Sequence, residues 1–109
     1  MKSKRKVLVI DDDRGHAETL AEVIEKEGHE CTLAFNGTDG IAAVDREDFD
    51  IIITDLVMND LSGLDILRRA KGKSPESEVI IVTGYASEET AIEALDEGAS
   101  DYIAKPFKI

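Results

Sequence analysis

Short apolar runs alternate along the chain with longer stretches in which apolar and charged residues are mixed. Three of the runs are rich in Val and Ile and end abruptly on polar residues; they occupy residues 7–10, 51–53 and 79–82. Continuous runs of this kind are typical of strands in a parallel sheet that is covered on both faces. Residues 30–35 alternate weakly and predict an edge strand, and residues 102–104 predict a fifth strand.

The intervening stretches have the spacing of amphipathic helices. The helix predicted after the first strand has its apolar positions three and four residues apart, at Ala17, Leu20, Val23 and Ile24. Gly28 is placed to end this helix. Further helices are predicted over residues 41–44, after a capping box formed by Ser62 and Asp65, and after Ser87. The apolar residues of this last helix are Ile92, Ala94 and Leu95.

Strands that alternate with helices over short loops imply right-handed crossovers and helices on both faces of the sheet. The predicted fold class is therefore α/β, a doubly wound sheet of five parallel strands. Such a sheet needs a closing helix on its second face, and none is predicted after residues 107–109. We expect residues 1–109 to form one domain that stops before its last helix. The open face, on the first and fifth strands, would expose apolar side chains and pair with a second copy or with more of a longer chain.

Length and charge narrow the classes of function. At 109 residues the chain forms one domain, and its net charge of −11 would repel nucleic acid and anionic membranes. No apolar run approaches the ~20 residues of a membrane span, and no signal peptide is visible. The single cysteine, Cys31, lies in an apolar stretch and is interpreted as a small core residue. We expect a cytoplasmic protein whose domain binds neither nucleic acid nor membrane.

Five polar residues stand where the predicted strands end. They are Asp11, Asp12, Asp55, Thr83 and Lys105. Because ligands of open parallel sheets bind beyond the carboxyl ends of the strands, these side chains are expected to converge on one rim. Carboxylates this close repel, and they would raise one another's pKa unless a cation lies among them. Oxygen ligands suit Mg²⁺, which proteins usually hold with one or two carboxylates and several waters.

A metal ion, an ammonium and a hydroxyl around one carboxylate are what phosphoryl transfer requires, namely charge neutralisation and an oxygen nucleophile in line. Taken singly, each residue has a simpler interpretation. An aspartate at a strand end is commonly a turn or capping residue, and Asp13 is placed to cap the helix that follows. The combination of all five residues at one rim is what favours phosphoryl chemistry.

Four segments together resemble the receiver domain of two-component response regulators. They are residues 9–13, 53–58, 82–84 and 102–107, with the sequences VIDDD, ITDLVM, VTG and YIAKPF. The resemblance covers essentially the whole chain and implies a flavodoxin-like strand order of 2-1-3-4-5. Residues 83–102 are also similar to receivers that precede σ54-activating ATPase modules, the nitrogen-regulatory type of regulator.

The resemblance implies a role for each residue at the rim. Asp55 would accept a phosphoryl group from a sensor histidine kinase or a phosphotransfer protein. Mg²⁺ would be the cofactor, bound directly by Asp12, Asp55 and the backbone carbonyl of Val57, with Asp11 acting through water. Lys105 would contact the acyl phosphate.

The resemblance also implies how a signal would leave the site. Thr83 would hydrogen-bond to the acyl phosphate, and Tyr102 would turn inward behind it. The domain would be a phosphorylation-dependent switch rather than an enzyme, joined to a C-terminal output domain for transcription and able to dimerise. Self-dephosphorylation would be slow, because the side chains nearest the attacking water, Val57 and Tyr85, carry neither an amide nor a carboxylate to orient it.

One departure from the family pattern lies in the loop after Asp55. The family usually has proline after the methionine, where this chain has Asn59. Asparagine tolerates turn geometry, so the loop is expected to form but to be more mobile.

Two other classes share part of the pattern. Asp11-x-Asp13 after an apolar strand resembles the nucleophile motif of haloacid-dehalogenase-like phosphatases, which would make Asp11 the nucleophile of a turnover enzyme with Thr83 as its second motif. The chain is short for that fold and lacks a later acidic pair. A flavodoxin-like electron carrier shares the fold, but three aspartates in the first loop would repel the flavin phosphate, and there is no Trp to stack on the ring.

Overall fold

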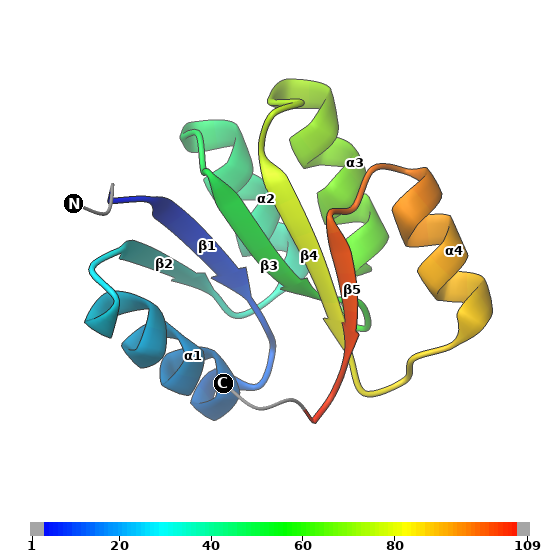
Figure 1. Cartoon of the computed structure of the whole chain (residues 1–109), viewed down its shortest axis with the longest axis horizontal. Coiled ribbons are helices and arrows are strands. Elements are labelled where there is room, and N and C mark those ends of the chain that lie inside the picture. The colour runs from blue at the N-terminus through cyan, green and yellow to red at the C-terminus, as the bar shows by residue number, and fades with distance from the viewer. Residues whose placement is uncertain (1–3, 107–109) are drawn as a thin grey trace.

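A single sheet of five parallel strands and four connecting helices make up the described part of the chain, residues 4–106, in the computed structural model (Figure 1). The strands are β1 (Lys6–Ile10), β2 (Glu30–Ala34), β3 (Ile51–Asp55), β4 (Glu78–Thr83) and β5 (Asp101–Ala104). The helices are α1 (Arg14–Lys26), α2 (Gly37–Arg46), α3 (Gly63–Lys73) and α4 (Glu88–Asp96). The strand order β2-β1-β3-β4-β5 confirms the predicted doubly wound α/β sheet and places β2 at an edge.

The two faces of the sheet have separate cores. In the view of Figure 1, α1 lies in front of the sheet, and α2 and α3 lie behind it. The larger core, on the side of α2, α3 and α4, includes Leu8, Ile52 and Leu67, each at most 1% exposed. The smaller core, under α1, includes Val7 and Val9. Successive residues of a strand point to opposite faces, so β1 contributes to both cores.

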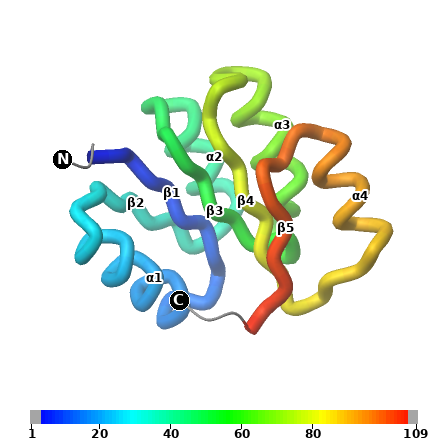
Figure 2. Tube along the Cα trace, viewed as in Figure 1, coloured from blue at the N-terminus to red at the C-terminus, as the bar shows by residue number. Residues whose placement is uncertain are grey.

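The strand register aligns the carboxyl ends of the central strands. Ile10 of β1 lies beside Thr54 of β3, and Thr83 of β4 lies beside Ala104 of β5. The loops that follow these residues therefore gather along one rim, at the lower edge of the sheet in the view of Figure 2. Parallel strands place their polar end residues at the same rim in this way.

Side-chain caps set where the helices begin. The capping residues are Asp13, Asn36, Ser62 and Ser87. Ser62 and Asp65 form the predicted capping box at the start of α3. At the other end of α1, Gly28 has a φ of 90°, in the left-handed region that glycine adopts without strain, so the helix ends as predicted.

Helix α4 packs on the sheet through a narrow stripe. Of its apolar residues only Ala94 is buried, whereas Ile92 and Leu95 are 53% and 51% exposed. A short helix packed at the edge of a sheet buries a narrow stripe, and small Ala94 occupies that stripe. The helix predicted after Ser87 is therefore confirmed, and it exposes two of the three apolar residues that the sequence places on it.

The predicted open face includes the fifth strand, as expected, but not the first. Val7 and Val9 of β1 are buried because α1 packs over β1 and β2. Apolar residues that stay only partly covered on this side include Ile53 of β3, Ile80 of β4 and Ile103 of β5. Cys31 and Leu33 of the edge strand β2 are also only partly covered. A helix about 10 Å wide covers roughly two strands spaced by about 4.8 Å, so α1 leaves the other strands half-covered. The prediction that β3 is buried on both faces is therefore wrong for one face.

Cys31 is half-buried against the smaller core. Burial raises the pKa of its thiol to about 11, with a further contribution from Glu25, so the side chain behaves as a packing residue, as interpreted. No helix within residues 4–106 combines the length and apolar character needed to cross a membrane. Phe107, the last residue of the motif in residues 102–107, and the expected lack of a closing helix after it lie outside the described residues.

Gly63, the first residue of α3, allows a test of how closely α3 packs against the end of β3. A Cβ on Gly63 would lie 2.5 Å from the carbonyl oxygen of Asp55 and 3.0 Å from the Cα of Leu56. Gly63→Ala should lower the free energy of unfolding by about 1–3 kcal/mol, because backbone must shift to admit the methyl group. Gly72→Ala, on the same helix with open space around it, should be neutral or stabilising by up to about 1 kcal/mol. Urea unfolding measures both, and equal stabilities would contradict the close packing of α3 on β3.

Candidate functional site

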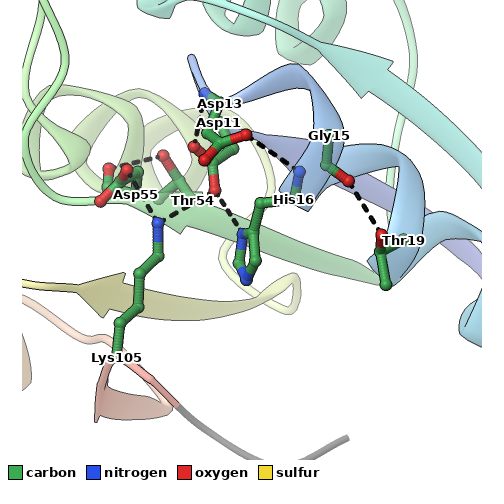
Figure 3. A network of polar contacts seen from close by, with 8 residues as sticks. All are labelled: Asp11, Asp13, Gly15, His16, Thr19, Thr54, Asp55 and Lys105. Atoms are coloured by element: carbon green, nitrogen blue, oxygen red, sulfur yellow. Dashed lines mark hydrogen bonds and ion pairs between the residues drawn. The ribbon is translucent and has the colours of Figure 1, made fainter.

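The rim brings together two carboxylates and one ammonium from distant parts of the chain. The Lys105 Nζ atom lies 3.1 Å from Oδ2 of Asp11 and 3.1 Å from Oδ2 of Asp55. Figure 3 shows the lysine side chain reaching from the segment after β5 to both carboxylates, which follow β1 and end β3. The convergence predicted for Asp11, Asp55 and Lys105 is therefore observed.

This ion-pair cluster is largely shielded from water. The side chains of Asp11, Asp55 and Lys105 are 3%, 9% and 21% exposed. Burial lowers the pKa of Lys105, but its hydrogen bonds to the two carboxylates outweigh burial and leave that pKa raised. The ammonium is thus held in its charged form at a fixed place between the two carboxylates.

Both carboxylate oxygens of Asp11 have hydrogen-bond partners. Its Oδ1 accepts a hydrogen bond from the backbone N–H of Asp13 at 2.9 Å, and its Oδ2 lies 2.7 Å from Nδ1 of His16 as well as near Lys105. Burial raises the pKa of Asp11, but these three donors more than offset burial, and the net pKa lies below its ordinary value. Crowding was predicted to raise the pKa values of the rim carboxylates unless a cation lies among them, and at Asp11 the Lys105 ammonium and the other local donors outweigh the crowding.

Asp55 has the opposite balance. Burial raises its pKa, the hydrogen bond from Lys105 lowers it, and the negative charges of Asp11 and Asp12 raise it again, so the net pKa is above its ordinary value. The carboxylate therefore gains from any added positive charge. A cation or an electrophile at this position would relieve an unfavourable ionised state.

Asp12 completes a group of three carboxylates. It is exposed, unlike Asp11 and Asp55, and ligand oxygens of the three lie within 4.8 Å of one another. An all-oxygen set with one open side fits a hard divalent cation that retains water, as Mg²⁺ does. The donors present at the rim are thus the right kind for the predicted metal ion.

A cavity of about 330 Å³ opens beside Asp55. Its lining residues are Asp12, Asp55, Val57, Met58, Asn59, Gly84, Tyr85 and Lys105. Val57 and Tyr85 therefore border the site as predicted, although the side chains are 49% and 78% exposed. Met58 and Gly84 also line the cavity, although the sequence did not assign them to the site. The one signal that could have found them is their position in the loops that follow β3 and β4.

Thr83 and Tyr102 occupy neighbouring strands but have different partners. Thr83 is fully buried, and its Oγ1 accepts a hydrogen bond from the backbone N–H of Tyr85 at 3.0 Å. The Tyr102 hydroxyl lies 2.6 Å from Oγ1 of Thr90 and accepts a longer hydrogen bond, 3.4 Å, from the backbone N–H of Ser87. The tyrosine is thus attached to the first turn of α4, a contact that sequence reasoning missed because Thr90 belongs to no motif.

The loop after β3 is anchored although it lacks the proline. Asp60 accepts hydrogen bonds from the hydroxyl and the backbone N–H of Thr38 at 2.7 and 2.8 Å, and from the backbone N–H of Gly37 at 2.9 Å. These bonds, led by those from Thr38, hold the pKa of Asp60 well below its usual range. The residue after Asn59 therefore ties the loop to the start of α2 and supplies an anchor that turn propensities do not predict.

Comparison with known proteins gives the family. The family model of the response regulator receiver domain matches residues 7–109. The transcriptional regulatory protein ZraR of Salmonella typhimurium is 36% identical over 107 residues, which cover 98% of this chain and 24% of ZraR. This chain therefore spans about a quarter of the length of that relative.

Two solved structures show the same fold at similar identity. A response regulator protein from Burkholderia pseudomallei, crystallised with a phosphorylated aspartic acid, calcium ion and citrate, superposes with a TM-score of 0.91 at 34% identity, covering 96% of this chain and 62% of that one. The beryllofluoride-activated NtrC4 receiver domain dimer superposes with a TM-score of 0.88 at 32% identity, covering 94% and 85%.

The chain belongs to the response regulator receiver domain family. It is therefore a phospho-accepting regulatory module of two-component signalling rather than an enzyme that turns over a substrate. The matches to ZraR and to the NtrC4 receiver bear out the predicted resemblance to receivers of σ54-activating regulators.

The opposite pKa shifts of Asp55 and Asp11 predict opposite effects of removing their charges. A raised pKa means that ionised Asp55 costs stability above that pKa, so Asp55→Asn should raise the melting temperature at neutral pH by a few degrees. A lowered pKa means that ionised Asp11 contributes stability, so Asp11→Asn should lower the melting temperature.

Thermal melts without divalent cations, taken from neutral to acid pH, measure both effects. The Asp55→Asn difference should fade as the pH falls through the raised pKa of Asp55 toward the ordinary aspartate value of 3.8. The Asp11→Asn difference should persist to about that value and fade only as the pH falls below it, toward the lowered pKa of Asp11. Shifts of the same sign for the two variants at neutral pH would contradict the assigned electrostatics.

Proposed function

We propose that Asp55 is the phospho-acceptor of this receiver domain and that Mg²⁺ is its cofactor. The observation that carries the proposal is the position of Asp55 at the end of β3, 3.1 Å from Lys105, where it lines a cavity together with Asp12. The crystal structure of the Burkholderia pseudomallei response regulator, with a phosphorylated aspartic acid and a calcium ion, supports the same chemistry.

The chain supplies a nucleophile and a fixed positive charge. In the proposed transfer, an Oδ atom of ionised Asp55 attacks phosphorus, the P–N bond to the donor imidazole breaks with its electron pair going to nitrogen, and an acyl phosphate forms. Lys105 already bonds to Asp55 and would bond to the incoming phosphoryl oxygens. Bound Mg²⁺ would neutralise the charge on those oxygens, held by Asp12, Asp55 and the carbonyl of Val57, with Asp11 acting through water.

Transmission of the signal would start at Thr83. The Thr83 hydroxyl, whose oxygen accepts a hydrogen bond from the backbone N–H of Tyr85, would donate its own hydrogen to a phosphoryl oxygen and move toward it. Movement of this segment would change the space beside Tyr102, whose hydroxyl bonds to Thr90 on α4. Phosphorylation would thereby bias the position of α4, a surface that already exposes Ile92 and Leu95.

The proposed role of Asp55 as phospho-acceptor also implies partners for this domain. A sensor histidine kinase or a phosphotransfer protein would supply the phosphoryl group, and a C-terminal output domain would receive the signal. The name of ZraR supports transcription as the output, and the NtrC4 receiver dimer supports dimerisation of this domain. A cytoplasmic location and a lack of direct contact with nucleic acid or membrane fit the net charge of −11.

Covalent labelling tests the proposal directly. The protein is incubated with acetyl phosphate and Mg²⁺, reduced with borohydride, and its peptides are weighed, because reduction converts an aspartyl phosphate to homoserine. We expect homoserine only at Asp55, loss of labelling in Asp55→Asn, and normal labelling in Asp96→Asn, whose exposed aspartate lies on α4. Label at Asp11, together with turnover of a phosphate monoester, would instead indicate a haloacid-dehalogenase-like phosphatase.

The cavity also predicts a long-lived phosphorylated state. Val57 and Tyr85 border the approach to Asp55, and neither side chain carries an amide or a carboxylate to orient water. Because Tyr85 is 78% exposed, the missing orienting group rather than steric screening carries this prediction. The double variant Val57→Asn, Tyr85→Glu should shorten the phosphorylated lifetime at least several-fold.

Decay of the labelled protein after removal of acetyl phosphate measures this lifetime. The control variant Val57→Ile, Tyr85→Phe changes each side chain by one heavy atom, adds no orienting group, and should decay like wild type. Equal decay of all three proteins would show that these positions do not control the attacking water.

A further inference from the structure

His16 lies at the site but belongs to no segment that carried the family resemblance. It is the third residue of α1, and its Nδ1 atom is 2.7 Å from Oδ2 of Asp11. The His16 side chain is 29% exposed and that of Asp11 is 3% exposed, so the contact is shielded from water on the aspartate side. The same Oδ2 atom also receives Lys105, from the opposite end of the chain.

Three hydrogen bonds among Asp11, Asp13 and His16 form a closed ring. The backbone N–H of Asp13 donates to Oδ1 of Asp11 at 2.9 Å, and the backbone N–H of His16 donates to Oδ1 of Asp13 at 3.1 Å. The His16 imidazole then returns to Asp11, as Figure 3 shows. In a capping box the third helical side chain reaches the backbone of the cap. Here the His16 side chain reaches past the cap residue, Asp13, to the carboxylate of Asp11. The ring therefore orients Asp11 and also caps the start of α1.

The direction of the imidazole hydrogen bond follows from the charge of Asp11. The backbone N–H of Asp13 and the ammonium of Lys105 both donate to Asp11, and a carboxylate with such neighbours only accepts hydrogen bonds, so Nδ1 of His16 carries the proton. His29, the other histidine of the chain, has the reverse arrangement, because its Nδ1 accepts a hydrogen bond from the backbone N–H of Arg5 at 3.1 Å. The two histidines therefore hold opposite tautomers.

We propose that His16 is a positioning residue that keeps Asp11 oriented toward the metal ion when Lys105 turns to the phosphoryl group. The proposal rests on the proposed phospho-acceptor role of Asp55. Lys105 is shared between Oδ2 of Asp11 and Oδ2 of Asp55, and a phosphoryl group on Asp55 adds negative oxygens that draw the ammonium away from Asp11.

After that movement, Oδ2 of Asp11 depends on His16 alone among the donors described here. A buried carboxylate that loses its donors rotates or becomes harder to ionise, and either change weakens its support for a cation. Partners that hold metal ligands in place commonly matter by tenfold or more in metal affinity. The contribution of His16 is therefore expected in the phosphorylated state and much less in the free state, where Lys105 still holds Asp11.

Two substitutions of similar shape separate a donor from mere packing. The Asn side-chain nitrogen is two bonds from Cβ, as is Nδ1 of histidine, so His16→Asn restores an N–H donor at nearly the same place. His16→Leu fills the same space without a donor. Beryllofluoride serves as the phosphoryl mimic, and Mg²⁺ is titrated with and without it, followed by ¹⁹F and amide NMR.

We expect His16→Leu to weaken Mg²⁺ binding about fivefold or more in the presence of beryllofluoride and less than about twofold in its absence. His16→Asn should stay within about twofold of wild type under both conditions. Equal losses with and without beryllofluoride, equal losses in the two variants, or no loss at all would overturn the positioning role. If wild type itself fails to bind beryllofluoride, the proposed function fails instead.

A second measurement needs no substitution. Long-range ¹H–¹⁵N spectra at alkaline pH, where imidazoles are neutral, report which ring nitrogen carries the proton. We expect His16 to be protonated on Nδ1 and His29 on Nε2, and we expect the His16 pattern to persist with Mg²⁺ and beryllofluoride bound. Protonation of His16 on Nε2 in the bound state would contradict the proposal. Because this measurement uses the wild-type protein, its outcome does not depend on whether the variants fold.

Discussion

The charge balance at the rim of the sheet is the constraint on which the rest of the structure depends. One ammonium, from Lys105, lies 3.1 Å from each of two buried carboxylates, Asp11 and Asp55. Burial makes each carboxylate costly to ionise, so each needs a donor, and the single lysine serves both. Asp11 has further donors of its own and becomes a stable anion, whereas Asp55 has few and becomes the reactive one. The asymmetry between two aspartates 44 residues apart in sequence thus comes from their neighbours, since the side chains themselves are identical.

Much of the surrounding structure keeps these groups in register. The cap at Asp13 ties the start of α1 to Asp11. Gly63 lets α3 approach the carbonyl oxygen of Asp55, and Asp60 fastens the loop after β3 to the start of α2. The opposite side of the site is less constrained, because Tyr85 is exposed and α4 buries only Ala94. A site that is rigid on the side of β1 and β3 and looser on the side of β4 and α4 is suited to a switch, since elements that move are drawn from the less stable parts of a fold.

The fold and the rim follow from the sequence because both depend on short-range signals. Runs of Val and Ile predict buried strands, their abrupt ends predict where Asp11, Asp55, Thr83 and Lys105 meet, and Asp13 and Ser62 are placed as caps. The rest depends on contacts between segments that carry no common pattern. Examples are the hydrogen bonds of His16 to Asp11, of Thr38 to Asp60 and of Thr90 to Tyr102. The width of α1 relative to the sheet decides which strands stay half-covered, and neither helix periodicity nor strand composition contains that information.

In the proposed switch, a phosphoryl group at Asp55 acts through Thr83 and Tyr102 on α4. Backbone amide NMR of the whole chain, before and after adding Mg²⁺ and beryllofluoride, tests it most directly. The account predicts that the largest shifts fall between Thr83 and Lys105 and include the first turn of α4 around Thr90, with none in Asp55→Asn. Shifts confined to residues 11–13 and 55–60 would show a site that binds its ligands without passing a signal on, and would contradict the account.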